Sequence, residues 1–334
     1  MNPYIAAQIS ALVEGIRLLE VYVTAPLGLY SDIKMMRESL PFPEAKELTR
    51  EEISHRRQAH ATLTADYPAL ALKAILAVRA TVDTLEASRE DGATVLDESW
   101  LRRASIVLTR AEQRMGANLR AKAIEKLTGI YVIVDPEATS GREPEVVARA
   151  ALEGGARVVQ LRDKQNDKKQ VLEQARRLMG LCQEHDALFF VNDDADVALA
   201  TEAHGLHVGQ SDLPTEEARK VLTPNQLIGR SNGSLDQALE SQAQEVDYIA
   251  IGAIYPTTTM GKSGRNALGP RMVERVKNAV PQPVVAIGGI NAGNLAEVVG
   301  AGADCVCVVS AVTCADDPGE ATRRLVDLFD ASSP

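Results

Sequence analysis

The chain has 334 residues, of which 45% are hydrophobic and 25% charged, so its composition excludes an intrinsically disordered protein and its length suits two domains. The net charge of −10 lies entirely in residues 128–334, because residues 1–127 hold 17 basic and 17 acidic side chains, and neither part has the basic excess typical of nucleic-acid binding. The apolar runs have the length of strands, so no membrane span is expected. The N-terminus has no basic region, so no signal peptide is expected. The four cysteines lack the spacing of metal or redox motifs, and we expect a cytoplasmic protein.

Residues 1–127 are predicted to be helical. Apolar side chains recur at helical spacing over residues 9–19 and 70–85, and residues 100–127 form an Arg- and Ala-rich stretch with the same period. Only four of the 23 glycines fall in this part. We expect an all-α N-terminal domain over residues 1–127, in which no residue pattern indicates a particular chemistry.

Residues 128–334 alternate between short β-rich runs and helical stretches. The eight runs are 129–135, 157–162, 188–192, 205–208, 227–230, 247–252, 283–287 and 304–309. Continuous apolar strands separated by helices favour parallel pairing with both sheet faces buried. Eight such units close a (β/α)8 TIM barrel, and a doubly wound open sheet is the alternative. The sequence predicts an α/β barrel over residues 128–334, preceded by the all-α domain.

Polar residues at the carboxyl ends of the strands are the candidates for function, because active sites of both parallel folds lie there. Gln160, Arg162 and Lys164 end the second predicted strand, and alternation points them the same way. Two converging cations suit a phosphate or diphosphate, while a surface salt-bridge cluster is the alternative.

Acidic residues follow the next two strands. Asn192, Asp193 and Asp194 end the third strand, and Asp212 follows the fourth. Carboxylates from neighbouring strand ends can form a Mg²⁺ site completed by substrate oxygens. The alternative is that Asp194 and Asp212 cap the helices that follow.

The last three strands lead into anion-binding patterns. Thr257, Thr258 and Thr259, followed by Lys262, offer hydroxyl and ammonium donors after the sixth strand. Gly289 ends the seventh strand and Ser310 the eighth, an arrangement typical of barrel phosphate sites.

Two residue pairs are expected to have structural roles. His204 and His207 lie three apart on a short strand, where they cannot face one metal, so packing or rim positions are expected. Cys305 and Cys307 share one face of the eighth strand, where we expect packing.

Seven ordered motifs give residues 128–330 a close resemblance to thiamine-phosphate synthases. The motifs are QLRDK at 160–164, VNDD at 191–194, GLHVGQSD at 205–212, GRS at 229–231, IYPTTT at 254–259, IGGI at 287–290 and VVSAV at 308–312. The N-terminal half more faintly resembles a helical extension of some bacterial members. The resemblance implies a barrel that joins 4-amino-2-methyl-5-hydroxymethylpyrimidine diphosphate to 4-methyl-5-(2-hydroxyethyl)thiazole phosphate. Mg²⁺ and cationic side chains would help diphosphate leave, and the thiazole nitrogen would capture the pyrimidine carbocation.

The same resemblance assigns roles to residues of this chain. Arg162 and Lys164 would hold the diphosphate, and Gln160 and Asn192 would add hydrogen bonds to it. Mg²⁺ would be held by Asp193 and Asp212. Ser231 would contact the pyrimidine diphosphate. The thiazole phosphate would bind to Thr257, Thr258, Thr259 and the amides near Gly289, Val309 and Ser310. We expect Arg162, Lys164 and Ser231 to be the catalytic residues.

One position departs from the family pattern. Met260 stands where the family usually has a lysine that reaches the diphosphate, and we hypothesise that Lys262 takes over this contact. The alternatives are a thiazole tautomerase, which shares the barrel, and a non-catalytic barrel that only binds thiazole phosphate. The partners expected are small-molecule substrates, and the residues leave open whether the chain forms a homo-oligomer.

Overall fold

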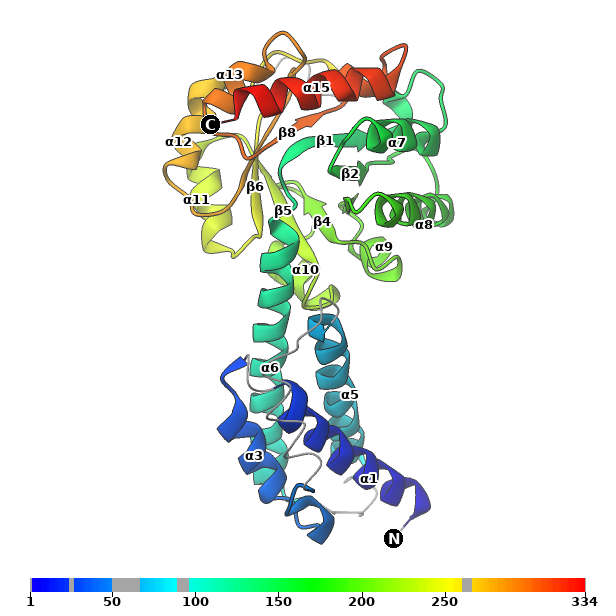
Figure 1. Ribbon diagram of the computed structural model, residues 1–334, viewed down its shortest axis with the longest axis vertical. Helices are drawn as coiled ribbons and strands as arrows, with labels where there is room; N and C mark the ends of the chain where they lie inside the picture. The colour runs from blue at the N-terminus through cyan, green and yellow to red at the C-terminus, as the bar shows by residue number, and fades with distance from the viewer. Residues whose placement is uncertain (1, 24–26, 50–66, 89–95, 260–265, 334) are drawn as a thin grey trace. The chain divides into compact units, whose positions relative to one another are not determined.

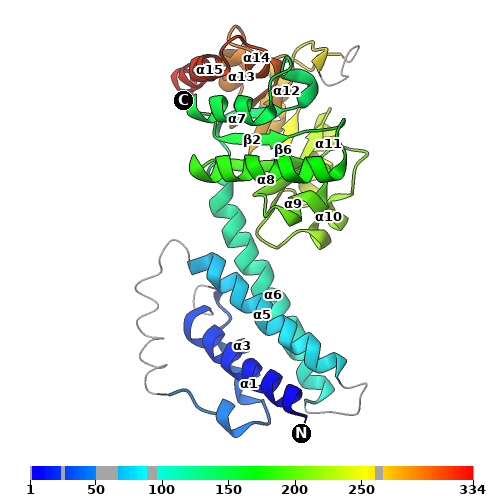
Figure 2. The same cartoon turned by 90° about the vertical axis from the view of Figure 1, so that its right-hand side faces the viewer.

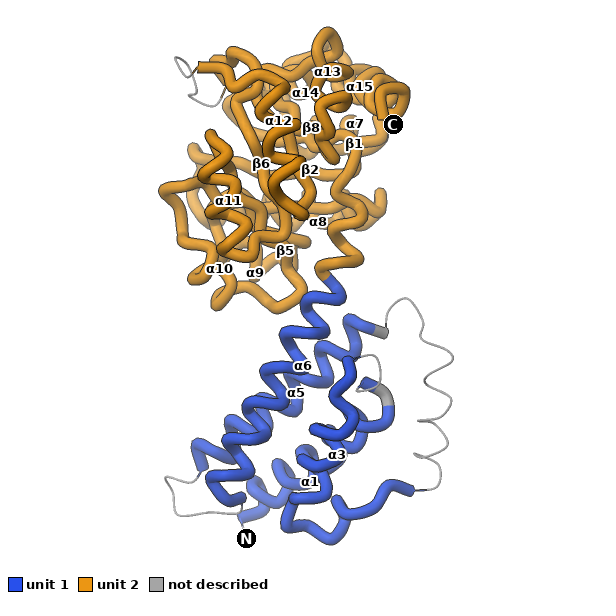
Figure 3. Tube along the Cα trace, turned by 90° about the vertical axis from the view of Figure 1, so that its left-hand side faces the viewer, with its two compact units in different colours: residues 1–119 blue, residues 120–334 orange. Residues whose placement is uncertain are grey.

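The computed structural model describes residues 2–23, 27–49, 67–88, 96–259 and 266–333. The chain divides into two compact units, Met1–Leu119 and Arg120–Pro334 (Figure 3). The sequence placed this division after residue 127. It lies earlier because the side chains of Ala123, Ile124 and Leu127 pack with the interior of the second unit. Among the described residues, no helix combines the length and the apolar character that a membrane span requires.

The described residues of the first unit are helical, as the sequence predicts. Its elements are α1 (Pro3–Leu18), the π-helical turn η1 (Leu19–Val23), α3 (Tyr30–Glu38), the 3-10 turn η2 (Pro43–Ala45), α5 (Tyr67–Ala87) and α6 (Glu98–Ile124), whose last residues belong to the second unit. Helices α1 and α5 lie side by side (Figure 1). Leu12, Ile75 and Trp100 are buried in one hydrophobic core, and the Trp100 indole donates to the Met36 carbonyl at 3.0 Å.

The second unit is a closed barrel of eight parallel strands, which confirms the predicted fold and excludes the open sheet. The strands are β1 (Gly129–Val134), β2 (Val158–Leu161), β3 (Leu188–Asn192), β4 (Gly205–Val208), β5 (Leu227–Asn232), β6 (Tyr248–Ile251), β7 (Val284–Ile287) and β8 (Cys305–Val308). They pair in sequence order, and β1 closes the ring by pairing Gly129 with Cys305.

Helices surround the barrel. They are α7 (Pro144–Glu153), α8 (Lys168–Glu184), α9 (Ala195–Ala200), α10 (Thr215–Val221), α11 (Leu235–Ala243), α12 (Pro270–Lys277), α13 (Leu295–Gly300), α14 (Ser310–Thr313) and α15 (Pro318–Ser332), and a 3-10 turn η3 (Pro136–Ala138) follows β1. Figure 2 shows α7 and α8 side by side on the outside of the barrel. Alternation along β1 explains the layers: Ile130 and Val132 pack outward against helices, whereas Tyr131 and Ile133 fill the barrel.

The barrel interior is aromatic near its amino end. The ring of Phe190 lies 5.9 Å from that of Tyr131 and 5.3 Å from that of Tyr248. Gly229 makes room for the Tyr248 ring, since a Cβ at residue 229 would lie 2.0 Å from its Cζ. Leu127 packs against the same cluster just before β1. The carboxyl end is therefore where the barrel can hold a ligand. Cys305 and Cys307 also pack in this interior, as expected.

Candidate active site

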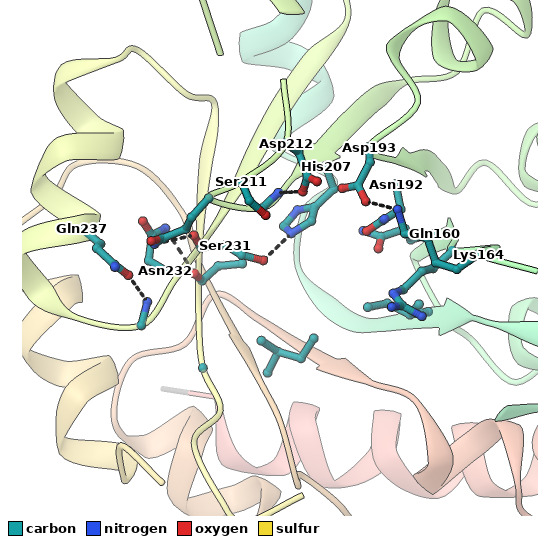
Figure 4. Close-up of a pocket in the computed structure, with 18 residues that line it drawn as sticks. Gln160, Lys164, Asn192, Asp193, His207, Ser211, Asp212, Ser231, Asn232 and Gln237 are labelled. Atoms are coloured by element: carbon teal, nitrogen blue, oxygen red, sulfur yellow. Dashed lines mark hydrogen bonds and ion pairs between the residues drawn. The ribbon is translucent and has the colours of Figure 1, made fainter. Parts of the chain in front are cut away.

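A cavity of about 520 Å³ lies at the carboxyl ends of the strands (Figure 4). It is lined by seven residues that the sequence singled out: Gln160, Arg162, Lys164, Asn192, Asp193, Asp212 and Ser231. They come from β2 and the residues after it, from β3 and the residue after it, from the segment after β4, and from β5. The parallel closed barrel brings them together because all its strands end on the same side.

Both cations at the end of β2 form ion pairs. Arg162 pairs with Asp135, and Lys164 pairs with Asp193. Lys164 is about half exposed and Arg162 is mostly covered, and both line the cavity. The salt-bridge alternative is thus correct about the pairing, but both cations line the cavity and are not part of a cluster on an outer surface.

Asp135 is a site residue that the sequence analysis missed. It follows β1 directly, is 1% exposed, and its Oδ1 accepts a hydrogen bond from the Glu137 amide at 3.0 Å. Its second oxygen pairs with Arg162. The carboxylate therefore holds the guanidinium, while a backbone amide holds the carboxylate. The signal was available, since Asp135 is the first polar residue after a continuous apolar strand.

Asp193 and Asp212 lie close enough to affect each other. Burial raises the pKa of Asp193, and the neighbouring Asp212 carboxyl adds to this rise, while the hydrogen bond from Lys164 opposes it. The backbone of Asp193 is left-handed, with φ of 60°, a conformation that Asp tolerates better than most residues. Such strain is common at functional positions.

The helix-cap alternative is wrong for Asp212 and holds for Asp194 in position only. The Asp212 carboxylate accepts from the Gly209 amide at 2.8 Å, and the N-cap position of α10 is Pro214. Asp194 does occupy the N-cap position of α9, but its side chain makes no capping hydrogen bond and pairs with Lys168. The Asp212 carboxylate is held in the cavity wall by its own loop.

His207 has a second role that the sequence did not predict. Its ring stacks on that of Tyr248 with 5.7 Å between the centroids, so the expected packing role holds. The residue also lines the cavity, where Nε2 lies 2.8 Å from Ser231 Oγ (Figure 4), while Nδ1 lies 2.7 Å from Tyr248 Oη. His204 has the expected structural role: its Nδ1 accepts from the Phe189 amide at 3.0 Å, and burial lowers its pKa to about 4.

The residues expected to bind the second phosphate lie near one another, beside the cavity and not in its described lining. Thr259 Oγ1 lies 3.4 Å from Ser310 Oγ, at the start of α14. Gly289 packs tightly on the β6 loop, since a Cβ there would lie 2.7 Å from the Pro256 carbonyl. Ile287, two residues earlier, lines the cavity. Thr257 and Thr258 belong to the same loop, and Val309 precedes Ser310 with its side chain in the barrel interior.

Met260 and Lys262 lie outside the described residues, so the hypothesis that Lys262 replaces the family lysine remains a prediction.

Comparison with known proteins identifies the barrel. The sequence model of the thiamine monophosphate synthase family matches residues 130–312, more than half of the chain. The chain belongs to this family. It is 39% identical over 201 residues to the thiamine-phosphate synthase of Methanospirillum hungatei, covering 60% of this chain and 97% of that protein. It is 44% identical over 207 residues to that of Thioalkalivibrio sulfidiphilus, covering 62% and 97%.

A solved structure agrees with the family assignment. The thiamine phosphate pyrophosphorylase from Pyrococcus furiosus is 38% identical, with a TM-score of 0.57, and the match covers 62% of this chain and 97% of that one. All seven motifs on which the resemblance to thiamine-phosphate synthases rests lie within the matched range 130–312. The resemblance is therefore confirmed, and its motifs occupy the carboxyl end of the family barrel.

Proposed function

We propose that the barrel is a thiamine-phosphate synthase, a transferase that joins the pyrimidine diphosphate to the thiazole phosphate. The C–O bond to the diphosphate breaks, a C–N bond to the thiazole nitrogen forms, and thiamine phosphate and diphosphate leave. One observation carries the proposal: Arg162, Lys164, Asp193 and Asp212 line a single cavity at the carboxyl end of a family barrel. Cations and carboxylates in that combination suit a diphosphate with its metal.

The chain's own residues can stabilise the departing charge. Arg162 and Lys164 would bind the diphosphate oxygens, and Asn192 would add a hydrogen bond from the end of β3. No proton need be removed before the C–O bond breaks, so the rate depends on positioning and on electrostatic stabilisation of the leaving group.

The carboxylates of Asp193 and Asp212 fit a Mg²⁺ ion, since both supply the hard oxygen ligands it prefers. The described residues contain no group of three or more metal-binding side chains, which suits an ion that completes its coordination with substrate oxygens and water. When bound there, Mg²⁺ would neutralise charge on the departing diphosphate.

The thiazole phosphate would bind beside this cavity. Hydroxyl groups of Thr257, Thr258 and Thr259 and the backbone amides near Gly289, Val309 and Ser310 would serve as its donors. This placement is supported by the approach of the β6 loop to Gly289 and Ser310. It would set the thiazole nitrogen next to the carbon from which diphosphate departs.

The two alternatives are less well supported. An argument against a tautomerase from the lack of a histidine in the cavity does not hold, because His207 lines it. However, a tautomerase has no need for the cations and carboxylates retained here, and the relatives described above are named synthases or pyrophosphorylases. We further propose a cytoplasmic location, which suits the buried thiols of Cys182, Cys305 and Cys307. The helical unit would form a separate N-terminal domain.

The decisive experiment supplies the purified full chain with both substrates, with Mg²⁺ or with EDTA. We expect thiamine phosphate only with Mg²⁺, and a loss of at least tenfold in kcat for Asp212→Asn. Absence of product with thiazole phosphate still bound would favour the non-catalytic barrel. Lys262→Ala tests the loop lysine: we expect about a 10- to 150-fold loss in kcat/KM, the cost of one charge-assisted contact, and unchanged kinetics would refute its role.

A further inference from the structure

Five side chains form a continuous hydrogen-bonded chain through the barrel interior, beneath the cavity. Gln160 Nε2 lies 2.6 Å from Tyr131 Oη, which lies 3.2 Å from Tyr248 Oη. Tyr248 Oη lies 2.7 Å from His207 Nδ1, and His207 Nε2 lies 2.8 Å from Ser231 Oγ. The two ends of this chain come from β2 and β5 and both line the cavity.

The direction of the hydrogen bonds follows from the amide end. The NH₂ group of Gln160 can only donate, so Tyr131 accepts there and its own O–H is available for Tyr248. If Tyr248 instead donated to Tyr131, the buried Tyr131 hydroxyl would accept twice and its proton would lack an acceptor among these groups, which is costly in a dry interior. Tyr248 therefore donates to His207 Nδ1, and the ring carries its proton on Nε2.

Both tyrosines keep their protons. Burial, as the largest cause, raises the pKa of Tyr131 and of Tyr248 well above 10. The same residues are held in place by the Phe190 ring packed against both of them. The chain of donors therefore has fixed geometry and a fixed sense.

The ends of the chain consequently differ in what they offer a ligand. Ser231 accepts from His207 Nε2, so its own O–H can donate into the cavity. Gln160 uses its NH₂ on Tyr131, and its Oε1 is buried without a hydrogen-bond partner within the described part of the chain. An unpaired buried acceptor is unusual and calls for a donor.

We propose that Tyr131, Tyr248 and His207 are positioning residues, which set Ser231 as a hydrogen-bond donor and Gln160 as an acceptor at opposite sides of the cavity. The ligand they select is a ring with an amino donor and a nitrogen acceptor, such as an aminopyrimidine; this identification rests on the proposed function. The histidine acts through Ser231 and touches no reacting atom.

The tautomer of His207 tests the direction of these hydrogen bonds, and measuring it does not require enzymatic activity. In full-length protein labelled with ¹⁵N-histidine, we expect the His207 ring to show a protonated Nε2 and an unprotonated Nδ1, with assignment from the His207→Gln variant. A protonated Nδ1 would overturn the proposal, because Ser231 would then donate to the histidine and not to the ligand.

A double-mutant cycle tests whether the tyrosine acts through the serine. Tyr248→Phe should lower kcat/KM for the pyrimidine diphosphate about tenfold, the effect of one buried hydrogen bond, and leave KM for the thiazole phosphate unchanged. In a Ser231→Ala background the same substitution should cost less than twofold. If the effects of Tyr248→Phe and Ser231→Ala on kcat/KM were fully additive, the proposal that Tyr248 acts through Ser231 would be overturned.

Phe190→Leu is the matched control, because it disturbs packing around both tyrosine rings without removing a hydrogen bond. It should lower the melting temperature with a much smaller loss in kcat/KM, and a loss equal to that of Tyr248→Phe would assign the effect to packing and refute the proposal. If the wild-type chain makes no thiamine phosphate, the proposed function fails. The His207 tautomer still shows in that case whether Ser231 is set as a hydrogen-bond donor.

Discussion

Asp135→Asn tests how far the activity depends on the contact that orients Arg162, because the variant leaves the guanidinium itself in place. Asparagine keeps an oxygen for the Glu137 amide, but its NH₂ group takes the place of the oxygen that accepts from Arg162, so the contact with the guanidinium is lost. The carboxylate is 1% exposed and the Arg162 side chain 21%, so this contact is largely shielded from water. A charge-assisted hydrogen bond of this kind contributes about 1.5–3 kcal/mol.

Two measurements report the loss. Urea unfolding followed by circular dichroism should show the barrel destabilised by about 2 kcal/mol. Steady-state kinetics should show kcat/KM for the pyrimidine diphosphate reduced about tenfold, because the guanidinium no longer has a fixed direction. The KM for the thiazole phosphate should not change.

Asp247→Asn provides the control at the opposite end of the barrel. Asp247 bridges Arg120 and Arg219 and accepts from the Ile228 amide at 2.7 Å, so it combines cations and a backbone donor as Asp135 does. It should lose comparable stability with unchanged kinetics. The reasoning is refuted if Asp135→Asn retains full kcat/KM, or if both variants lose activity equally.

Three further substitutions test the fold and the pH response. In the folded barrel the pKa of His204 is about 4, against an ordinary value of 6.5, so the unfolded chain binds more protons between these two pH values. The resulting stability of up to about 3 kcal/mol is complete above pH 6.5 and is lost as the pH falls toward 4. In urea unfolding, His204→Asn should reduce this dependence of stability on pH. Gly229→Ala, whose Cβ would lie 2.0 Å from the Tyr248 ring, should destabilise the barrel by about 3 kcal/mol or more in the same assay; a smaller loss would show that the ring can move. Gly289→Ala, with φ of 68° and the Pro256 carbonyl 2.7 Å from the new Cβ, should raise KM for the thiazole phosphate about tenfold, and an unchanged value would place that phosphate elsewhere.

The barrel was predictable because its signal is periodic and local. Eight apolar runs separated by helical stretches leave few parallel folds. Active sites of those folds lie at the carboxyl ends of the strands, so position along the chain alone groups Gln160, Arg162, Asp193 and Asp212. The division between the units was less accessible. Helix α6 continues past the division after Leu119, and only packing inside the barrel assigns its last residues to the second unit.

The sequence alone does not show which side chains of different strands contact each other. Asp135 lies 27 residues before Arg162, and nothing in either local pattern shows that they meet. The cavity position of His207 was missed because the spacing to His204 excluded a shared metal but did not show which residue points inward. Its orientation follows from the register, in which His207 pairs with Gly229 and so lies beside the Tyr248 ring, which fills the space that Gly229 leaves.

If the proposed function holds, the pairing of Lys164 with Asp193 would link the binding of metal to the binding of diphosphate. A divalent cation that takes the Asp193 carboxylate must displace the Lys164 ammonium, and the displaced ammonium is then available to a diphosphate. A diphosphate that attracts Lys164 likewise exposes the carboxylate to a cation. By thermodynamic reciprocity, each ligand then increases the affinity for the other by the same factor. On the proposed function, the lysine would act as a counter-ion that neutralises the partly buried carboxylate until both ligands arrive, so states with only one ligand bound would be disfavoured.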